Sequence, residues 1–563
     1  MNIVILLLFV LNAYESEGSY DYIIVGSGPS GAALANRLST NPNVYVLLLE
    51  AGERPNLLTE VPSYYFYLYG SSYDWNYNVT FPKFPNMERR PPVHLPHGKG
   101  LGGESLINSM LYIRGNRKDF DNWEKKGACG WGWREIFPLF RRSERNLNPD
   151  VANNGYHGTK GEMFVQRPAF ITHLAGKYLQ AAQELGFKLG DVNGKNQSVF
   201  SIPQIISKDG RRWGVDKAFI YPIEGRWNLN IATKALVKKI IIRNKVAIGV
   251  EYDFDGVRRK AYAREEVILA AGAIRSPQLL MLSGIGPIRQ LSNFRIPVLS
   301  NLPVGENLHD HSVFSIPLYK VDNLTVSEKD YKEFFERGTG LLSISPTEVV
   351  GFFSTIYNED YDWPDAEIVL VTLPSSVFSS SWDQGRATVI CANMVQRPKS
   401  RGRLTLRGRD PRTPPLIEGM YLYKDEDANV LVEGIKMCLK LGNTQAMRGI
   451  GDRIPPPSIP ACNNHPAASD EYYRCLGRQL ATPGYHVVGT CKMGDPNDHT
   501  TVVDFDLKVK GIKNLRVADS SIAPEVITGC TFALDVLIGE KAADLIFRDY
   551  YAKVGNAKNP FTE

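Results

Sequence analysis

Four residues near the N-terminus have the types and spacing of a dinucleotide-binding site. Gly26, Gly28 and Gly31 follow a hydrophobic run, and Glu50 follows Gly31 by 19 residues. Gly26 allows a tight turn, Gly28 lets backbone amides approach a pyrophosphate, and Gly31 lets a helix pack closely on a strand. The carboxylate of Glu50 is placed to accept the ribose hydroxyls of an adenine dinucleotide. This fingerprint predicts dinucleotide binding and by itself does not separate FAD from NAD.

The same segment contains the elements that must position these residues. Residues 22–25 form a strand-like run, a helix is expected from Ala32, and a second strand ends at Glu50. A helix that begins at such a turn offers unpaired N–H groups and the positive end of its dipole to phosphate. Strand, turn, helix, second strand and acid therefore read as one nucleotide-binding unit.

Four further segments place glycine and polar side chains beside apolar runs. They span residues 98–108, 272–286, 485–494 and 515–531. Backbone amides of the first segment could hold an anion or an electron-rich ring edge, although such a loop is more often a structural turn. The second segment follows an apolar strand and is typical of a turn and a helix capped by glycine.

Composition limits the class of protein. The chain has 563 residues, which is too long for one ordinary core, so at least two domains are expected. Apolar residues make up 43% and charged residues 22%, a globular composition. The net charge is only +5 and no Lys/Arg run stands out, so nothing indicates nucleic acid. No Cys or His cluster has metal-ligand spacing, and no metal site is predicted.

The N-terminus predicts export. Residues 3–11 are apolar, which is too short for a membrane span but suits the core of a signal peptide over residues 1–18. A buried N-terminal strand is the alternative. We therefore expect a secreted, extracellular protein without a membrane span.

Cysteines and glycosylation sequons agree with export. Of seven cysteines, Cys462 and Cys475 are separated by a polar stretch that contains proline, so they are either a disulfide or two free thiols. Acceptor sequons occur at Asn78, Asn196 and Asn323, which predict a glycoprotein if the chain is exported.

Strand-like segments that suit a nucleotide domain recur along the chain, and long mixed segments interrupt them. This order predicts an α/β fold, in which a FAD-binding Rossmann-like domain is discontinuous and an α+β substrate domain built on an antiparallel sheet is inserted in pieces. The FAD-binding domain is assigned to residues 19–60, 93–150, 226–310 and 483–555. The substrate-binding domain is assigned to residues 61–92, 151–225 and 311–482.

The fingerprint and the four later segments together resemble the glucose–methanol–choline (GMC) oxidoreductase family. The resemblance runs from about Tyr20 to Asp549, with the motifs in the family's order. Residues 111–116 and 303–311 are similar to its arthropod branch, which includes glucose dehydrogenase-like, ecdysone oxidase-like and aromatic alcohol or mandelonitrile oxidase-like enzymes. The resemblance implies FAD, hydride chemistry on an alcohol and a large antiparallel sheet in the substrate domain.

The resemblance also assigns site residues. His486 corresponds to the catalytic histidine, and a neutral imidazole is suited to take the hydroxyl proton while hydride leaves for flavin N5. Cys530 stands beside it in the substrate site. The helix that begins near Thr531 is expected to direct its dipole at the reduced flavin. The residues implied at the cofactor, besides the fingerprint, are Gly103, Asn108, Val237, Asp519, Thr531 and Phe532.

Three departures from the family pattern affect the expected chemistry. Cys530 replaces a His or Asn, and a thiol in an apolar site stays protonated, so Cys530 is a poor base and shapes the pocket for a less polar alcohol. Glu104 replaces a small hydroxyl residue, and we expect it to point away from the flavin or to pair with a cation, because its charge would oppose reduced flavin. Ile107 replaces the histidine of members with a covalent link, which implies non-covalent FAD.

The leading interpretation is a secreted FAD-dependent oxidase of a small aromatic alcohol or cyanohydrin such as mandelonitrile, with oxygen or a quinone as acceptor. The aromatic run at residues 64–69 favours this substrate class, although such clusters are more often packing. The alternatives are a glucose- or sterol-type dehydrogenase with a quinone acceptor, a flavin-containing hydroxynitrile lyase, and an inactive relative. The oligomeric state is not predicted.

Overall fold

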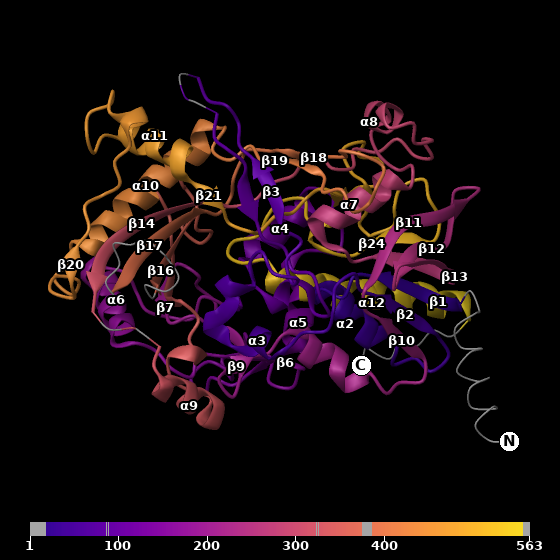
Figure 1. The fold of residues 1–563 in the computed structure, drawn as a ribbon, viewed down its shortest axis with the longest axis horizontal. Coiled ribbons are helices and arrows are strands. Elements are labelled where there is room, and N and C mark those ends of the chain that lie inside the picture. The colour runs from indigo at the N-terminus through magenta and orange to yellow at the C-terminus, as the bar shows by residue number, and fades with distance from the viewer. Residues whose placement is uncertain are drawn as a thin grey trace.

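A computed structural model describes residues 18–85, 87, 89–322, 324, 326–373 and 386–555 of the chain. The expected signal peptide core and the sequon at Asn323 lie outside these residues. Two large sheets stand at opposite ends of the molecule, with helices and short strands between them (Figure 1). The description below therefore concerns these sheets and the loops that meet between them.

The first sheet carries the predicted nucleotide-binding unit. Its strand order is β10-β2-β1-β13-β12-β11, and β24 pairs with β13 in parallel. The strands β10, β2, β1 and β13 are parallel, whereas β13, β12 and β11 form an antiparallel extension. The bounds are β1 (Gly18–Val25), β2 (Val46–Leu49), β10 (Leu229–Ala232), β11 (Ala235–Arg243), β12 (Val246–Phe254), β13 (Val257–Leu269) and β24 (Leu515–Val517).

Helices cover the parallel strands because those strands are apolar on both faces. All four residues of β2 are buried, as expected for a parallel strand between two helical layers. The covering helices are α2 (Pro29–Leu38), α7 (Gly272–Leu282) and α12 (Phe532–Lys553). The helix α2 lies against α12 so closely that a Cβ at Gly539 would stand 2.3 Å from the Ser30 carbonyl oxygen. This packing fixes the start of α2, where a phosphate group would bind.

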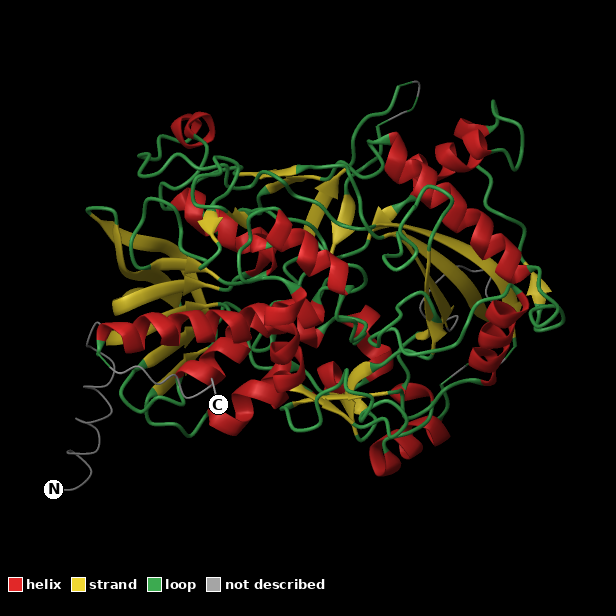
Figure 2. Ribbon diagram, turned by 180° about the vertical axis from the view of Figure 1, so that it is seen from behind, coloured by secondary structure: helices red, strands yellow, loops and turns green. Residues whose placement is uncertain are grey.

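The second sheet is antiparallel and has one face toward helices. Its order is β20-β14-β17-β16-β15-β7, and β21 pairs with β14. The helices α6, α10 and α11 lie on its outer side, seen on the right in Figure 2. The bounds are β7 (Phe200–Ser201), β14 (Ser312–Val321), β15 (Thr347–Phe353), β16 (Ala366–Leu373), β17 (Ala387–Val395), β20 (Asp452–Arg453), β21 (Thr482–Pro483), α6 (His173–Glu184), α10 (Asp425–Gly442) and α11 (Asp470–Leu480).

Side-chain alternation divides the residues of this sheet between two environments. In β16, Ile368 and Leu370 belong to the core beneath the helices, while Val369 and Val371 face the opposite way and line a cavity. A period of two is what a strand requires, so one strand supplies both a core and a binding surface.

Two disulfides hold helices in this part of the molecule. Cys391 on β17 is joined to Cys438 on α10. Cys462 is joined to Cys475 on α11, which confirms the disulfide alternative for that pair. The first pair was not predicted, because 47 residues separate its members and only the tertiary fold brings them together.

Shorter elements connect the two large sheets. The short strands are β3 (Tyr77–Thr80), β4 (Val93–Leu95), β5 (Glu144–Asn146), β6 (Met163–Gln166), β8 (Ile205–Lys208), β9 (Arg211–Arg212), β18 (Arg403–Thr405), β19 (Leu416–Glu418), β22 (Met493–Gly494) and β23 (Val503–Asp504). The other helices are α3 (Leu57–Glu60), α4 (Arg117–Lys125), α5 (Trp133–Ser143), α8 (Ile288–Asn293) and α9 (Glu328–Arg337). The 3-10 helices η1 (Pro62–Leu68), η2 (Gly103–Leu106) and η8 (Ser520–Ile522) border the site described below.

The predicted fold class is confirmed, with a nucleotide-binding sheet and a separate antiparallel sheet. The segment limits of the two domains stay a prediction. Within the described ranges, no helix combines the length and apolar character needed to cross a bilayer.

Candidate functional site

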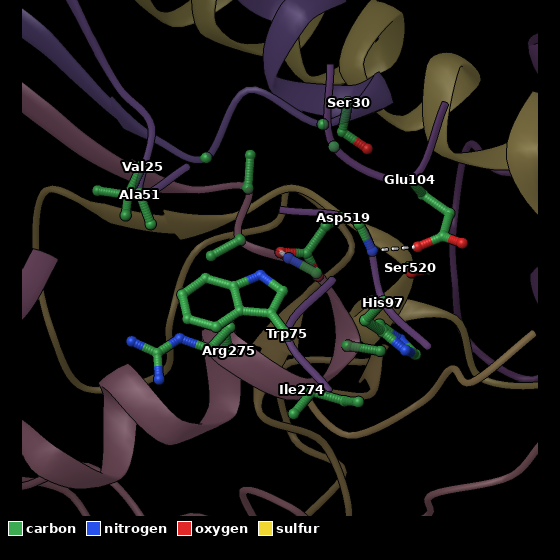
Figure 3. Close-up of a pocket in the computed structure, with 18 of the residues that line it drawn as sticks. Val25, Ser30, Ala51, Trp75, His97, Glu104, Ile274, Arg275, Asp519 and Ser520 are labelled. Atoms are coloured by element: carbon green, nitrogen blue, oxygen red, sulfur yellow. Dashed lines mark hydrogen bonds between the residues drawn. The ribbon is translucent and has the colours of Figure 1, made fainter. Parts of the chain in front are cut away.

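A first cavity lies at the carboxyl ends of the parallel strands, where ligands bind in open α/β sheets. We call it the dinucleotide cavity, and Figure 3 shows part of its lining. Among the predicted residues, those that line it are Gly26, Gly28, Glu50, Gly103, Val237, Asp519 and Thr531. Gly31 lies beneath the turn, and its side-chain position is taken by the backbone, because a Cβ there would stand 2.0 Å from the Gly26 carbonyl oxygen.

Gly28 borders open space in the dinucleotide cavity. A Cβ added at Gly28 would meet no heavy atom within 4 Å, although the residue borders the cavity and precedes the first turn of α2. A glycine that faces open space at a helix N-terminus is what close approach of a pyrophosphate to the backbone requires. The residues present therefore fit a dinucleotide.

Two carboxylates at the strand ends are held by hydrogen bonds. Glu50 accepts bonds from the Gly52 amide at 2.7 Å and from the Ser27 hydroxyl at 2.7 Å. Asp519 accepts bonds from the Gly272 amide at 2.9 Å and the Ser276 hydroxyl at 2.5 Å. Burial raises the pKa of both carboxyl groups. Each oxygen is oriented by its donors, so the remaining lone pairs have fixed directions for a ligand.

A second cavity, which we call the histidine cavity, lies between the loops of the first sheet and the inner face of the second. Its empty volume is about 1610 Å³, open solvent at the mouth included. Val369, Val371 and Ile390 form its floor on the second sheet. From the aromatic run at residues 64–69, Tyr65, Phe66 and Tyr69 also line it. The cavity is thus largely apolar and aromatic.

His486 lines this cavity and is held by a second histidine. The Nδ1 atoms of His486 and His311 are 3.0 Å apart, and the Nε2 atom of His311 lies 3.1 Å from the Gln396 carbonyl oxygen. A carbonyl only accepts, so we assign the proton of neutral His311 to Nε2, and its Nδ1 then accepts a hydrogen bond from His486. The proton of His486 is then on Nδ1. Its Nε2 lone pair is left free to act as a base.

Burial keeps both imidazoles neutral. It lowers the pKa of His486 to about 4 and that of His311 well below the usual value. The backbone around His486 is also fixed, because its amide donates to the Asp310 carboxylate at 2.8 Å. The preceding residue, Tyr485, has a φ of +64°, a left-handed conformation that is costly for a non-glycine residue and clusters at functional sites.

Cys530, Asn108 and Phe532 line the histidine cavity together with His486. Burial raises the pKa of the Cys530 thiol well above its usual value, with a smaller contribution from the Glu367 carboxylate. The thiol is therefore neutral near pH 7. Asn108 is oriented by Arg212, whose guanidinium donates to its side-chain oxygen at 2.8 Å.

The expectation that Glu104 points away or pairs with a cation is wrong. Its side chain lines both cavities, and its carboxylate accepts a hydrogen bond from the Gly98 amide at 2.7 Å, drawn as a dashed line in Figure 3. The reason is local: the loop at residues 98–103 folds back on η2 and presents a backbone donor. Burial raises the pKa of Glu104 to about 7, so its carboxyl group is partly protonated near pH 7.

Five residues line both cavities and mark the passage between them. They are Pro29, Glu104, Tyr485, Thr531 and Asp535. A cofactor bound at Gly28 and Glu50 that also reaches His486 must extend through this passage.

Sequence reasoning assigned no role to several of these residues. His311 enters the sequence pattern only as the end of a family-like segment, and no motif includes Gln396 or Asp535. Their contacts depend on pairing between distant segments, and the only local signal for them is a polar residue in apolar surroundings. No group of three or more potential metal ligands is found in the part of the chain that the structure describes.

The open space at Gly28 generates a prediction about cofactor binding. Gly28→Val should fold normally, because the φ of −63° suits any residue and an added Cβ meets no heavy atom within 4 Å. It should weaken binding of FAD, the dinucleotide that the resemblance implies, by about tenfold or more, since the side chain occupies the cradle. Fluorescence titration of the apo-protein with FAD measures this, with Gly176→Val in α6 as control. An unchanged affinity would contradict the assignment.

Comparisons with known proteins agree with this geometry. Sequence profiles described as GMC oxidoreductase match residues 20–313 and 398–539. Glucose dehydrogenase [FAD, quinone] of Drosophila melanogaster is 35% identical over 97% of this chain and 90% of its own length. Alcohol dehydrogenase [acceptor] of Pseudomonas putida is 35% identical over 94% of this chain and 96% of its own length. A formate oxidase structure from Aspergillus oryzae, from a study of FAD modification, superposes with a TM-score of 0.86 at 26% identity, covering 95% and 99% of the two chains. The chain therefore belongs to the GMC oxidoreductase family.

Proposed function

We propose that the protein uses non-covalently bound FAD to oxidise the CH–OH group of a small aromatic alcohol or cyanohydrin, of which mandelonitrile is one candidate. The observation that carries the proposal is the free Nε2 lone pair of His486 in an apolar, aromatic cavity. When bound, FAD supplies the hydride acceptor. His486 removes the hydroxyl proton, and Cys530 contributes shape without charge.

The cavity lining supports the substrate class. An alcohol with an aromatic ring gains from burial against Tyr65, Phe66 and the valines of β16. A sugar would need several fixed hydrogen-bond partners, and a site that leaves hydroxyls unpaired penalises them. The neutral thiol at Cys530 adds only a weak donor.

The relatives favour a second candidate. Two glucose dehydrogenases [FAD, quinone] from Drosophila are each 35% identical to this chain over 97% of its length. A glucose- or sterol-type dehydrogenase with a quinone acceptor is therefore the alternative, and oxygen or a quinone remains open as acceptor in either case.

Non-covalent attachment and export belong to the same proposal. Ile107, which is buried, has no nucleophilic atom for a covalent flavin link at the position where covalent members carry histidine. Disulfides are typical of oxidising compartments, and two are present among the described residues. The sequon residues Asn78 and Asn196 are exposed, as glycan attachment requires.

The substrate class is tested by anaerobic mixing of the FAD-loaded protein with benzylic alcohols, mandelonitrile, glucose and sterols. We expect loss of flavin absorbance near ~450 nm with the aromatic compounds and little with glucose. Faster reduction by glucose would favour the alternative. Cyanide release without loss of absorbance would identify a lyase, and no reaction with any alcohol would contradict the proposal.

The role of His486 is tested by substitution and by pH. His486→Ala should lower the rate of flavin reduction by about 10²-fold or more, whereas His173→Ala, at an exposed position on α6, should not. Because burial lowers the pKa of His486 to about 4, its imidazole is neutral from pH 8 to 6 and becomes protonated only at lower pH. Stopped-flow reduction should therefore lose no rate between pH 8 and 6 and should fall toward pH 4. A variant as fast as the parent, or half of the rate lost near pH 6.5, would contradict the assignment.

A further inference from the structure

Two carboxyl groups stand in the passage between the cavities. Glu104 belongs to η2 and Asp535 to the first turn of α12, and both side chains line the dinucleotide cavity and the histidine cavity. A cofactor that joins Gly28 to the neighbourhood of His486 passes beside both. A negative charge that develops on the cofactor would therefore lie close to two carboxyl groups.

The two acids are poorly compensated by positive charge. The Glu104 carboxylate receives its hydrogen bond from the Gly98 amide, and Asp74 raises its pKa while the Arg212 guanidinium lowers it by a smaller amount. The Asp535 carboxylate accepts a hydrogen bond from the Ser520 amide at 2.8 Å, and the Ser30 hydroxyl, 3.4 Å from the carboxylate, donates to the Asp535 backbone carbonyl at 2.6 Å. The donors are neutral, so neither acid has an ion-pair partner among the bonds that orient it.

Other titratable groups nearby add to the negative balance. Asp519, which precedes η8, and Glu104 both raise the pKa of Asp535. Tyr69 and His97 also border Glu104, and their pKa values are shifted so that both are neutral near pH 7. Glu104, Asp535 and Asp519 therefore bring several potential anions together, and Arg212 is the cation that acts on Glu104.

We propose that Glu104 and Asp535 form a redox-linked proton site, which takes up a proton from solvent when the bound flavin becomes anionic on reduction and releases it on reoxidation. The proposal rests on the FAD binding proposed above. In this step, one carboxylate and one proton from solvent give one carboxylic acid. The electrons that reduce the flavin come from the reductant alone.

The direction of this coupling follows from charge. Burial and like-charge repulsion raise the pKa of each carboxyl to about 7, so the pair is partly ionised near neutral pH. An added negative charge nearby raises those pKa values further, as any like charge does, and the pair must then bind more protons at constant pH. The carboxyl groups thus offset the charge of the reduced cofactor instead of opposing it.

The experiment is anaerobic photoreduction of the FAD-loaded protein in weak buffer near pH 7.5, with an indicator dye that counts protons. The parent should take up more than about one proton per two electrons, and Glu104→Gln combined with Asp535→Asn should take up about one. Glu224→Gln, at an exposed carboxylate, is the matched control and should behave as the parent.

A second readout is the pH dependence of the flavin midpoint potential, which should be less steep in the double variant than in the parent. Glu104→Gln alone serves if the double variant does not retain FAD. Uptake of only about one proton per two electrons by the parent, or equal uptake by the parent and the Glu104 and Asp535 variants, would overturn the proposal. Photoreduction needs no alcohol, so the measured proton uptake does not depend on whether the proposed substrate class is correct.

Discussion

The chemistry of this protein depends on one hydrogen bond between two buried imidazoles. We assign the proton between the Nδ1 atoms of His311 and His486 to His486, because the Gln396 carbonyl accepts from Nε2 of neutral His311. Burial makes protonation of either ring costly, so the pair stays neutral. A base with a defined tautomer results, and the Asp310 carboxylate fixes the backbone of His486 beside it.

The two sheets are placed so that this base can face a cofactor. The parallel sheet ends at the glycine turn, Glu50 and Asp519, and the antiparallel sheet turns one face of β16 and β17 toward the same space. His311 stands directly before β14 of the second sheet, whereas His486 follows β21 on the neighbouring segment. Pairing of β14 with β21 therefore brings the two histidines together. The base exists only when the second sheet is assembled.

Much of this arrangement could be predicted from the sequence, where the signal is local or follows a family pattern. The glycine turn, the strand that ends before Glu50, and the helix after Thr531 all lie close to their predicted places. His486 and Cys530 could be assigned only through the resemblance. The His311 contact, the Cys391–Cys438 disulfide and the passage beside Glu104 depend on contacts between distant segments. Glu104 shows the limit most clearly, because a charge argument predicted that it would turn away, whereas burial and a backbone donor keep it in the site.

The tautomer of His486 tests the central claim most directly. Nitrogen-15 NMR of histidine-labelled protein, assigned with His486→Ala and His311→Gln variants, reports the proton on each ring nitrogen. The structure predicts that from pH 6 to 8 His486 is neutral, with Nδ1 protonated and Nε2 not. A proton on Nε2 of His486, or an imidazolium signal in that range, would contradict the account.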